Sequence, residues 1–167
     1  MKWIIDLDAE KCSSCGACAI ACMDQNDIDV ETEAPFRNVY ILERQSKGAR
    51  RSSFLSVACM HCTDAPCVQA CPTGCLYKDE ETGLTLYDAN LCIGCHSCSM
   101  ACPFGAPKFS AQGRLKKCDG CHVRLKCGME PACVRVCPTG ALKVYDAETY
   151  EKEKLDKSLH TLANSML

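Results

Sequence analysis

Sixteen of the eighteen cysteines in this 167-residue chain form four groups of four, and no other feature restricts the possible folds as strongly. The first and third groups have the spacing C-x2-C-x2-C-x3-C, which is the bacterial ferredoxin pattern for ligands of a 4Fe-4S cluster. The second group lengthens one gap to C-x2-C-x4-C-x3-C, and the fourth lengthens it to C-x2-C-x11-C-x3-C. The groups are Cys12, Cys15, Cys18 and Cys22; Cys59, Cys62, Cys67 and Cys71; Cys92, Cys95, Cys98 and Cys102; and Cys118, Cys121, Cys133 and Cys137. We therefore expect four 4Fe-4S clusters as cofactors and electron transfer as the function.

The small size of the chain indicates that bound metal stabilises the fold. Below about 70–80 residues a hydrophobic core supplies only about 3–5 kcal/mol, and each half of this chain is near that length. A disulfide scaffold is the alternative for a short cysteine-rich chain. Two features argue against it: residues 1–6 lead directly into a strand pattern without a signal peptide, and the tight C-x2-C-x2-C triplets offer poor disulfide partners.

Charge and hydropathy exclude two classes of partner. The formal net charge is −2, and four oxidised clusters would add roughly two negative charges each. Because the basic residues are scattered, we expect no binding to nucleic acid. No apolar run approaches the roughly eighteen residues that indicate a spanning helix. We therefore expect a cytoplasmic protein without a transmembrane segment.

The chain repeats a ferredoxin half-unit, which consists of a short strand, a cysteine-rich loop and a brief helix that begins near the third cysteine. Proline follows the last cysteine in three groups, at Pro72, Pro103 and Pro138, and ends the helix there. Cys-Pro-Thr-Gly occurs twice, at residues 71–74 and 137–140, each time before a strand-like segment. The expected fold class is α+β, with two ferredoxin-like modules in a pseudo-twofold relation and a C-terminal helix.

These repeats predict how the chain is divided. Residues 38–43 alternate in polarity and predict a strand, and residues 79–91 predict a small hairpin. The predicted segments are an outer module (1–22 and 103–145, with the first and fourth groups), a connecting insertion (23–58), an inner module (59–102) and a C-terminal helix (146–167).

The charged tail predicts a helix that begins after Asp146 as N-cap. Leu155, Leu159, Leu162 and Met166 fall on one face of this helix. A helix packed on the body and a helix that docks a partner subunit both account for that face. A frayed tail is the third possibility.

The spacing of the groups favours a nested pairing of ligands. In two-cluster ferredoxins the fourth cysteine of each run binds the other cluster. The second and third groups are only twenty residues apart, so we pair them with each other and pair the first group with the fourth. Two ferredoxins in series, first with second and third with fourth, are the alternative. The nested sets are Cys12, Cys15, Cys18 and Cys137 (cluster 1); Cys59, Cys62, Cys67 and Cys102 (cluster 2); Cys92, Cys95, Cys98 and Cys71 (cluster 3); and Cys118, Cys121, Cys133 and Cys22 (cluster 4).

Segments around these cysteines resemble a known family. Residues 60–67 and 117–121, followed by 131–142, are similar to the four-cluster electron-transfer subunits of molybdenum and tungsten oxidoreductases. Dimethyl sulfoxide reductase, formate dehydrogenase and tungsten aldehyde oxidoreductase complexes have subunits of this kind. The resemblance covers roughly residues 3–145, and all sixteen ligand positions match in order and spacing. It implies the nested pairing, because the family pairs its cysteines in that way, and four 4Fe-4S clusters.

The resemblance also implies partners. The main one is a catalytic molybdenum or tungsten subunit, of the dimethyl sulfoxide reductase or aldehyde oxidoreductase type. A flavin subunit or a ferredoxin is expected as the second redox partner, and self-association is a further expectation. The compact chain favours a small complex such as the tungsten aldehyde oxidoreductases have. A free polyferredoxin that moves between enzymes is the alternative function.

Several residues near the ligands need an interpretation. Cys75 and Cys127 are expected to be inert, partly buried thiols, with Cys127 replacing Cys133 as the alternative. His61, His96 and His122 each adjoin a ligand cysteine and are expected to form hydrogen bonds near a cluster. Zinc binding by the C-x2-C pairs is the alternative for the whole protein.

The sequence contains no P-loop, GxGxxG, GxSxG or HExxH motif, so we expect no catalytic residues and no enzyme activity by the chain itself. One basic group has a simple interpretation as a solvated face, with a docking patch as the alternative. The group consists of Arg114, Lys116, Lys117, Arg124 and Lys126.

Overall fold

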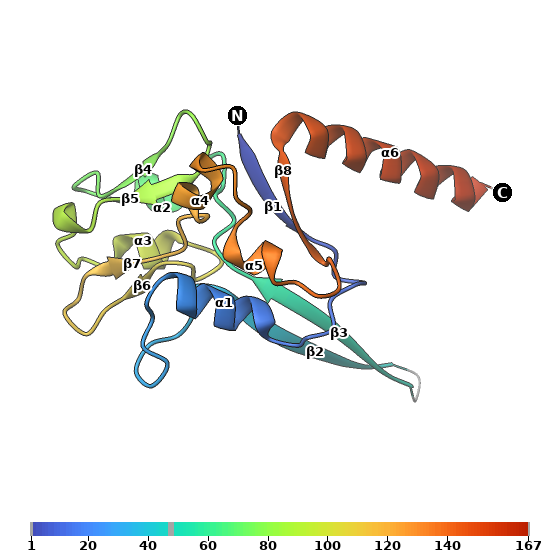
Figure 1. The fold of residues 1–167 in the computed structure, drawn as a ribbon, viewed down its shortest axis with the longest axis horizontal. Coiled ribbons are helices and arrows are strands. Elements are labelled where there is room, and N and C mark those ends of the chain that lie inside the picture. The colour runs from blue at the N-terminus through green and yellow to red at the C-terminus, as the bar shows by residue number, and fades with distance from the viewer. Residues whose placement is uncertain (1, 47–48, 167) are drawn as a thin grey trace.

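The computed structural model describes residues 2–46 and 49–166, and it describes no side chains at residues 46, 49 and 160–166. Within these residues the strands form small antiparallel pairs (Figure 1). β1 (Trp3–Leu7) pairs with β8 (Leu142–Asp146), although they come from opposite ends of the chain. β4 (Leu76–Lys78) pairs with β5 (Thr85–Tyr87). The predicted opening strand and the strands after both Cys-Pro-Thr-Gly segments are confirmed.

The helices of the four cysteine groups follow one rule. Each begins one residue before the third cysteine of its group, as the repeat predicted, and the proline that follows three of the groups lies beyond the helix end. Only the first group lacks that proline, and its helix is the longest of the four. The helices are α1 (Ala17–Gln25), α2 (Pro66–Gln69), α3 (Ser97–Ala101) and α5 (Ala132–Arg135), and α4 (His122–Lys126) lies in the long gap of the fourth group.

The helices pack in two pairs. α1 contacts α5, and α2 contacts α3. The first pair brings together helices of the first and fourth cysteine groups that are more than a hundred residues apart, and the second pair joins the adjacent second and third groups. Figure 1 shows the two pairs as separate parts of the body, with β1 and β8 beside α5.

The region between the first and second groups contains more structure than the sequence predicted. The predicted strand at residues 38–43 is confirmed as part of β2 (Asn38–Ser46), but it pairs with a second strand, β3 (Ala49–Val57). The sequence analysis missed β3 because its first half is polar and does not alternate. Backbone pairing with β2 satisfies its hydrogen bonds, so the strand needs no apolar face of its own. The β2–β3 hairpin projects from the body (Figure 1).

Short hairpins complete the chain. The predicted hairpin at residues 79–91 is present as β4–β5, although residues 89–91 form a single 3-10 turn. Gly83 occupies its turn with φ +70°, a conformation that glycine adopts without strain. A further hairpin joins β6 (Lys108–Phe109) and β7 (Leu115–Lys116).

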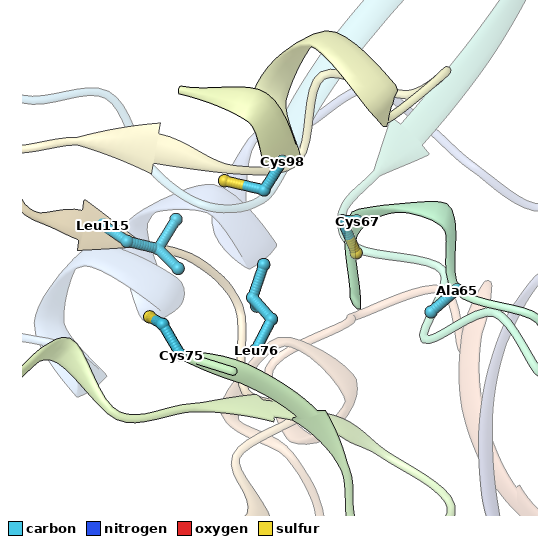
Figure 2. Close-up of a cluster of buried hydrophobic side chains, with 6 residues drawn as sticks. All are labelled: Ala65, Cys67, Cys75, Leu76, Cys98 and Leu115. Atoms are coloured by element: carbon cyan, nitrogen blue, oxygen red, sulfur yellow. The ribbon is translucent and has the colours of Figure 1, made fainter. Parts of the chain in front are cut away.

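The hydrophobic core is divided into small clusters, and most of them contain ligand cysteines. Cys67 and Cys98, from the second and third groups, share one cluster with Leu76 (Figure 2). Cys18 and Cys133, from the first and fourth groups, share another. Figure 2 shows Leu76 in the middle of its cluster, with Cys67 on one side. A further cluster contains no cysteine and is formed by Leu84, Leu86 and Leu125. Because thiols belong to the other clusters, much of the core packing depends on the cysteines.

The C-terminal helix α6 (Ala147–Met166) begins as the sequence predicted. Asp146 accepts hydrogen bonds from the Thr149 amide at 3.0 Å and the Thr149 hydroxyl at 2.6 Å, which is N-cap geometry. Its first two turns contact the body: the Tyr150 hydroxyl donates to Asp6 at 3.3 Å, and Lys154 forms a salt bridge with Asp6 at 3.2 Å.

The rest of α6 points away from the body (Figure 1). Two of the four predicted face residues, Leu155 and Leu159, are 62% and 56% exposed. The other two, Leu162 and Met166, lie outside the residues whose side chains are described. In the part of the chain that the structure describes, no helix is both long and apolar enough to cross a membrane.

Candidate metal centres

Cysteines from distant parts of the chain gather around a first cavity of about 320 Å³, measured with its mouth. Its walls carry the first three cysteines of the first group and Cys137, the last of the fourth group. The four cysteines therefore line one shared cavity, although they come from opposite ends of the chain.

Two further cavities repeat this arrangement with the second and third groups, at about 330 and 280 Å³. In each, three cysteines of one group meet the last cysteine of the other: Cys102 joins the second group, and Cys71 joins the third. The series pairing would bring Cys71 to the first cavity. It lines the third instead. The second cavity carries Cys59, Cys62, Cys67 and Cys102, and the third carries Cys92, Cys95, Cys98 and Cys71.

The remaining four cysteines lie together at a fourth place, between α1 and the fourth group. Cys22 packs with Cys118 in one hydrophobic cluster. Cys121 and Cys22 lie close enough to Cys133 for their thiols to interact electrostatically. Every cysteine of the four predicted sets therefore lies beside members of its own set.

All four groups share one backbone turn that the sequence analysis did not anticipate. The residue before the second cysteine has positive φ in every group, between +46° and +71°. Glycine occupies this position in two groups, and those two glycines were the sequence signal from which the turn could have been predicted. Non-glycine residues in this conformation cost about 1–2 kcal/mol. The four residues are Ser14, His61, Gly94 and Gly120.

Hydrogen bonds approach the sulfurs from side chains and backbone. The two Cys-Pro-Thr-Gly segments act alike: the hydroxyls of Thr73 and Thr139 lie 3.7 Å from the sulfurs of Cys71 and Cys137. The backbone amide of Gly120 donates to Cys118, and that of Leu115 donates to Cys92, both at 3.4 Å. Donors of this kind stabilise negative charge on sulfur.

His61 links two of the sites. Its Nδ1 accepts a hydrogen bond from the Thr85 amide at 3.0 Å, so the proton of the neutral ring resides on Nε2. Nε2 lies 3.7 Å from the Cys118 sulfur. Burial holds the pKa of His61 well below its usual value, and the nearby cations Lys117, Lys78 and Arg37 act in the same direction. His61 therefore has the contact near a ligand sulfur that the sequence predicted.

The other two histidines behave differently. His122 Nδ1 lies 2.9 Å from an Asp119 carboxylate oxygen, and the ring of His96 stacks against Phe109 with 3.8 Å between centroids. Neither residue shows a hydrogen bond to a sulfur within the described residues.

The prediction that the basic group forms a solvated face is wrong for one residue, Lys117. Lys117 is 1% exposed, and its ammonium donates to the carbonyls of Thr85 at 2.5 Å and Cys118 at 2.6 Å. By contrast, Lys116 forms a salt bridge with Glu33 at 2.7 Å on the half-exposed surface. The sequence analysis erred because Lys117 enters the space between two cysteine sites, a position that only the tertiary structure creates.

The buried charges indicate whether anionic clusters fit these sites. Arg37 and Lys117 are the charged members of the buried set, which contains no carboxylate among the described residues, and Arg37 Nε has no hydrogen-bond partner there. An isolated buried cation costs several kcal/mol. Anionic iron–sulfur clusters held by the cysteines would supply the missing negative charge, so the residues present fit the cofactor.

The thiols themselves favour their neutral form until metal binds. Burial raises the pKa of Cys121 to about 11 and raises the pKa of Cys118 further. Metal ligation therefore has to displace protons from these thiols. Among the described residues, no three histidine, cysteine, aspartate or glutamate side chains converge on a point that could hold a single metal ion, and the cysteines instead line cavity walls.

The two spare cysteines occupy contrasting environments. Cys75 is 2% exposed and lines the third cavity, where burial and then Cys92 raise its pKa to about 12. Cys127 is exposed, so its predicted partial burial is wrong: it ends α4 on the surface. Cys133, in contrast, is buried on α5, close to Cys22 and Cys121 of the fourth site.

Comparison with known proteins gives concordant matches. The family model described as "4Fe-4S dicluster domain" matches residues 50–147. The B subunit of the anaerobic dimethyl sulfoxide reductase of Haemophilus influenzae is 39% identical over 145 residues, which cover 81% of this chain and 69% of that protein. The thiosulfate reductase electron transfer subunit PhsB of Salmonella typhi is 41% identical over 144 residues, covering 85% and 74%. A formate dehydrogenase iron–sulfur subunit of Wolinella succinogenes is 34% identical over 165 residues, covering 85% and 80%.

Proposed function

This chain belongs to the family of iron–sulfur electron-transfer subunits of anaerobic reductases and formate dehydrogenases, and on that premise we propose that it carries single electrons between a catalytic molybdenum subunit and a second redox partner. The chain is a non-catalytic subunit. Its relatives are named for electron transfer or for iron–sulfur content.

The observation that carries the proposal is the gathering of cysteines from separate groups at each site. Cys137 lies with the first group and Cys102 with the second, which supports the nested ligand assignment. The proposed ligand sets are Cys12, Cys15, Cys18 and Cys137 (cluster 1); Cys59, Cys62, Cys67 and Cys102 (cluster 2); Cys92, Cys95, Cys98 and Cys71 (cluster 3); and Cys118, Cys121, Cys133 and Cys22 (cluster 4).

The chain's own residues prepare these sites. When bound, 4Fe-4S clusters supply one-electron redox chemistry. The left-handed turn in each group directs the first two cysteines to one cavity, and the following helix carries the fourth cysteine toward the neighbouring cavity. Donors such as the Thr73 and Thr139 hydroxyls stabilise charge on the sulfurs that they approach.

Contacts between the sites support a linear order. The first and fourth sites share α1 and α5, and the second and third share α2 and α3. His61 connects the second site to Cys118 of the fourth. Cys15 and Cys95 are exposed, one at the first site and one at the third. We therefore place electron exchange with partners at the first and third sites, and transfer between modules at the contact of the second and fourth.

The same contacts support an outer module of the first and fourth groups with β1 and β8, and an inner module of the second and third groups. The β6–β7 hairpin, which the sequence analysis assigned to the outer module, contributes Phe109 and Leu115 to the third cavity and is therefore proposed to belong to the inner module. Each module contains two cysteine helices and at least one pair of short strands, which supports a pseudo-twofold relation between them.

The relatives favour a catalytic partner of the dimethyl sulfoxide reductase type. A tungsten aldehyde oxidoreductase partner, a flavin subunit or ferredoxin as second partner, self-association through α6, and a cytoplasmic location stay predictions. A free polyferredoxin is disfavoured, because the relatives are subunits of reductase and dehydrogenase complexes.

The proposal is tested by purifying the native protein without oxygen and measuring iron, labile sulfide and co-purifying proteins. We expect about sixteen iron atoms per chain and a molybdenum-containing subunit bound to it. Zinc without sulfide would contradict the electron-transfer function. A full iron complement without any bound partner would instead support the free polyferredoxin.

A further inference from the structure

Two adjacent lysines occupy opposite environments, and one of them is placed between cysteine sites. Lys116 pairs with Glu33 near the surface. Lys117 is 1% exposed and has no carboxylate partner among the described salt bridges. Its ammonium is held instead by the carbonyls of Thr85 and Cys118, at 2.5 and 2.6 Å.

Lys117 contacts two metal sites at once. Its side chain lines the second cavity together with Cys67 and Cys102. Its hydrogen bond to the Cys118 carbonyl fixes the ammonium beside the fourth site. The ammonium thus lies near cysteines of both the second and the fourth groups. The charge is therefore shared between a site of the inner module and a site of the outer module.

Lys78 adds a second cation on one side of this contact. Its ammonium donates to the carbonyls of Cys62 at 2.9 Å, His61 at 3.1 Å and Gly83 at 2.6 Å. Two of these carbonyls belong to the loop of the second cysteine group. Lys78 thus places its positive charge beside the second site, whereas Lys117 places its charge beside both the second and the fourth sites.

The first and third cavities have a different lining. The walls of the first cavity are formed by cysteines, hydroxyl residues and apolar residues, with no lysine or arginine. The walls of the third cavity also lack both residue types. Arg37 is buried nearby, but its guanidinium donates to the Ser56 hydroxyl, which lies 3.2 Å from the Cys18 sulfur. Arg37 is therefore shared with the first site. Lys117 is the cation that distinguishes the second and fourth sites from the first and third.

We propose that Lys117, supported by Lys78, is a positioning residue that holds fixed positive charge between the second and fourth sites and raises the reduction potentials of the clusters there. This inference rests on the proposed function. A reduced cluster carries one more negative charge than an oxidised one, so a cation fixed in a buried, low-dielectric position stabilises the reduced form. The effect favours an electron at the contact between the two modules, where it passes from one to the other.

The test is a potentiometric titration of the reduced-state paramagnetic signals in the anaerobically purified full chain. The central variant is Lys117→Gln, because its amide still donates hydrogen bonds to the two carbonyls but carries no charge. The matched control is Lys116→Gln, which removes a charge one residue away on the surface. Lys117→Arg restores the charge.

We expect Lys117→Gln to shift two of the four midpoint potentials to more negative values and leave two unchanged, while Lys116→Gln shifts none and Lys117→Arg returns the shifted pair toward wild type. Four unchanged potentials in Lys117→Gln, or an equal shift of all four, would overturn the inference while leaving the proposed function intact. A wild-type chain without four clusters would overturn both.

Lys78→Gln covers the case in which Lys117→Gln fails to take up its iron. Because the second group is the one cysteine group whose loop Lys78 contacts among the described residues, this variant should lower one midpoint potential. An unchanged set of potentials in iron-replete Lys78→Gln would count against fixed charge as the tuning element.

Discussion

The Nε2 atom of His61 lies 3.7 Å from the sulfur of Cys118, across 57 residues of sequence. His61 belongs to the loop of the second cysteine group, and Cys118 opens the fourth. The Thr85 amide donates a hydrogen bond to Nδ1, so Nε2 carries the proton of the neutral ring, and this proton faces the sulfur. One imidazole therefore joins the second cysteine site to the fourth.

Replacing this imidazole should change one cluster. His61→Asn keeps an acceptor near Nδ1 and tolerates the positive φ, but it loses the donor toward Cys118. A net hydrogen bond of about 1 kcal/mol corresponds to roughly 40 mV for a one-electron couple. We expect one midpoint potential to fall by about this amount or less. His61→Gln, whose longer amide restores a donor, should show a smaller shift, and equal shifts in both variants would argue against the hydrogen bond.

Replacing Cys137 tests the nested pairing. Cys137→Ser should damage the cluster of the first site, because Cys137 lines that cavity. Iron analysis and paramagnetic spectra should show the same signal lost as in Cys15→Ser. The comparison variant is Cys121→Ser, which should affect a different signal. If Cys137→Ser instead matched Cys121→Ser, the nested pairing would be wrong.

The two spare cysteines should be dispensable for iron binding. Cys75→Ala and Cys127→Ala are each expected to retain about sixteen irons, because four clusters with four thiolates each are already supplied. Cys75 is the more demanding case, since it lines the third cavity. A loss of about four irons from Cys75→Ala would place it in the ligand set there. The same loss from Cys127→Ala would make Cys133 the spare thiol.

The turn before the second cysteine can be tested at Gly94. A Cβ on this residue would lie 2.9 Å from the Gly113 carbonyl oxygen, and φ is +69°. Gly94→Ala should therefore carry backbone strain of about 1–2 kcal/mol plus a steric clash. The control is Gly16→Ala, which has φ +77° but no atom within 4 Å. We expect the visible iron–sulfur absorption to bleach faster in denaturant for Gly94→Ala than for Gly16→Ala, and equal rates would show that the clash is relieved.

Shortening the tail separates a core role from an association role. A chain that ends after Lys154 keeps both contacts to Asp6 and should retain all four cluster signals. A chain that ends after Asp146 loses those contacts but should also keep its clusters, since none of the α6 side chains that the structure describes lines a cysteine cavity. Sedimentation should show weaker association with the catalytic subunit or with other copies in both truncations. Cluster loss in the chain that ends after Lys154 would show that the exposed part of α6 supports the fold.

Local signals in the sequence determined much of the fold. The third cysteine of each group predicted the start of each helix, because the loop before it must wrap three ligands around one site. The prolines after Cys71, Cys102 and Cys137 predicted where those helices end, since proline cannot continue a helix. Asp146 predicted the start of α6 through its side-chain cap. These features depend on residues only a few positions apart.

The tertiary structure alone decided which distant residues meet. Spacing left nested and series pairings open, and the pairing of β1 with β8 together with the packing of α1 against α5 brings Cys137 beside Cys12. Lys117 resembled its solvated neighbours in sequence, yet folding places it between two sites. The polar strand β3 has no pattern of its own because its stability comes from pairing with β2. A sequence records each residue's chemistry, whereas burial and long-range electrostatics depend on where the rest of the chain lies.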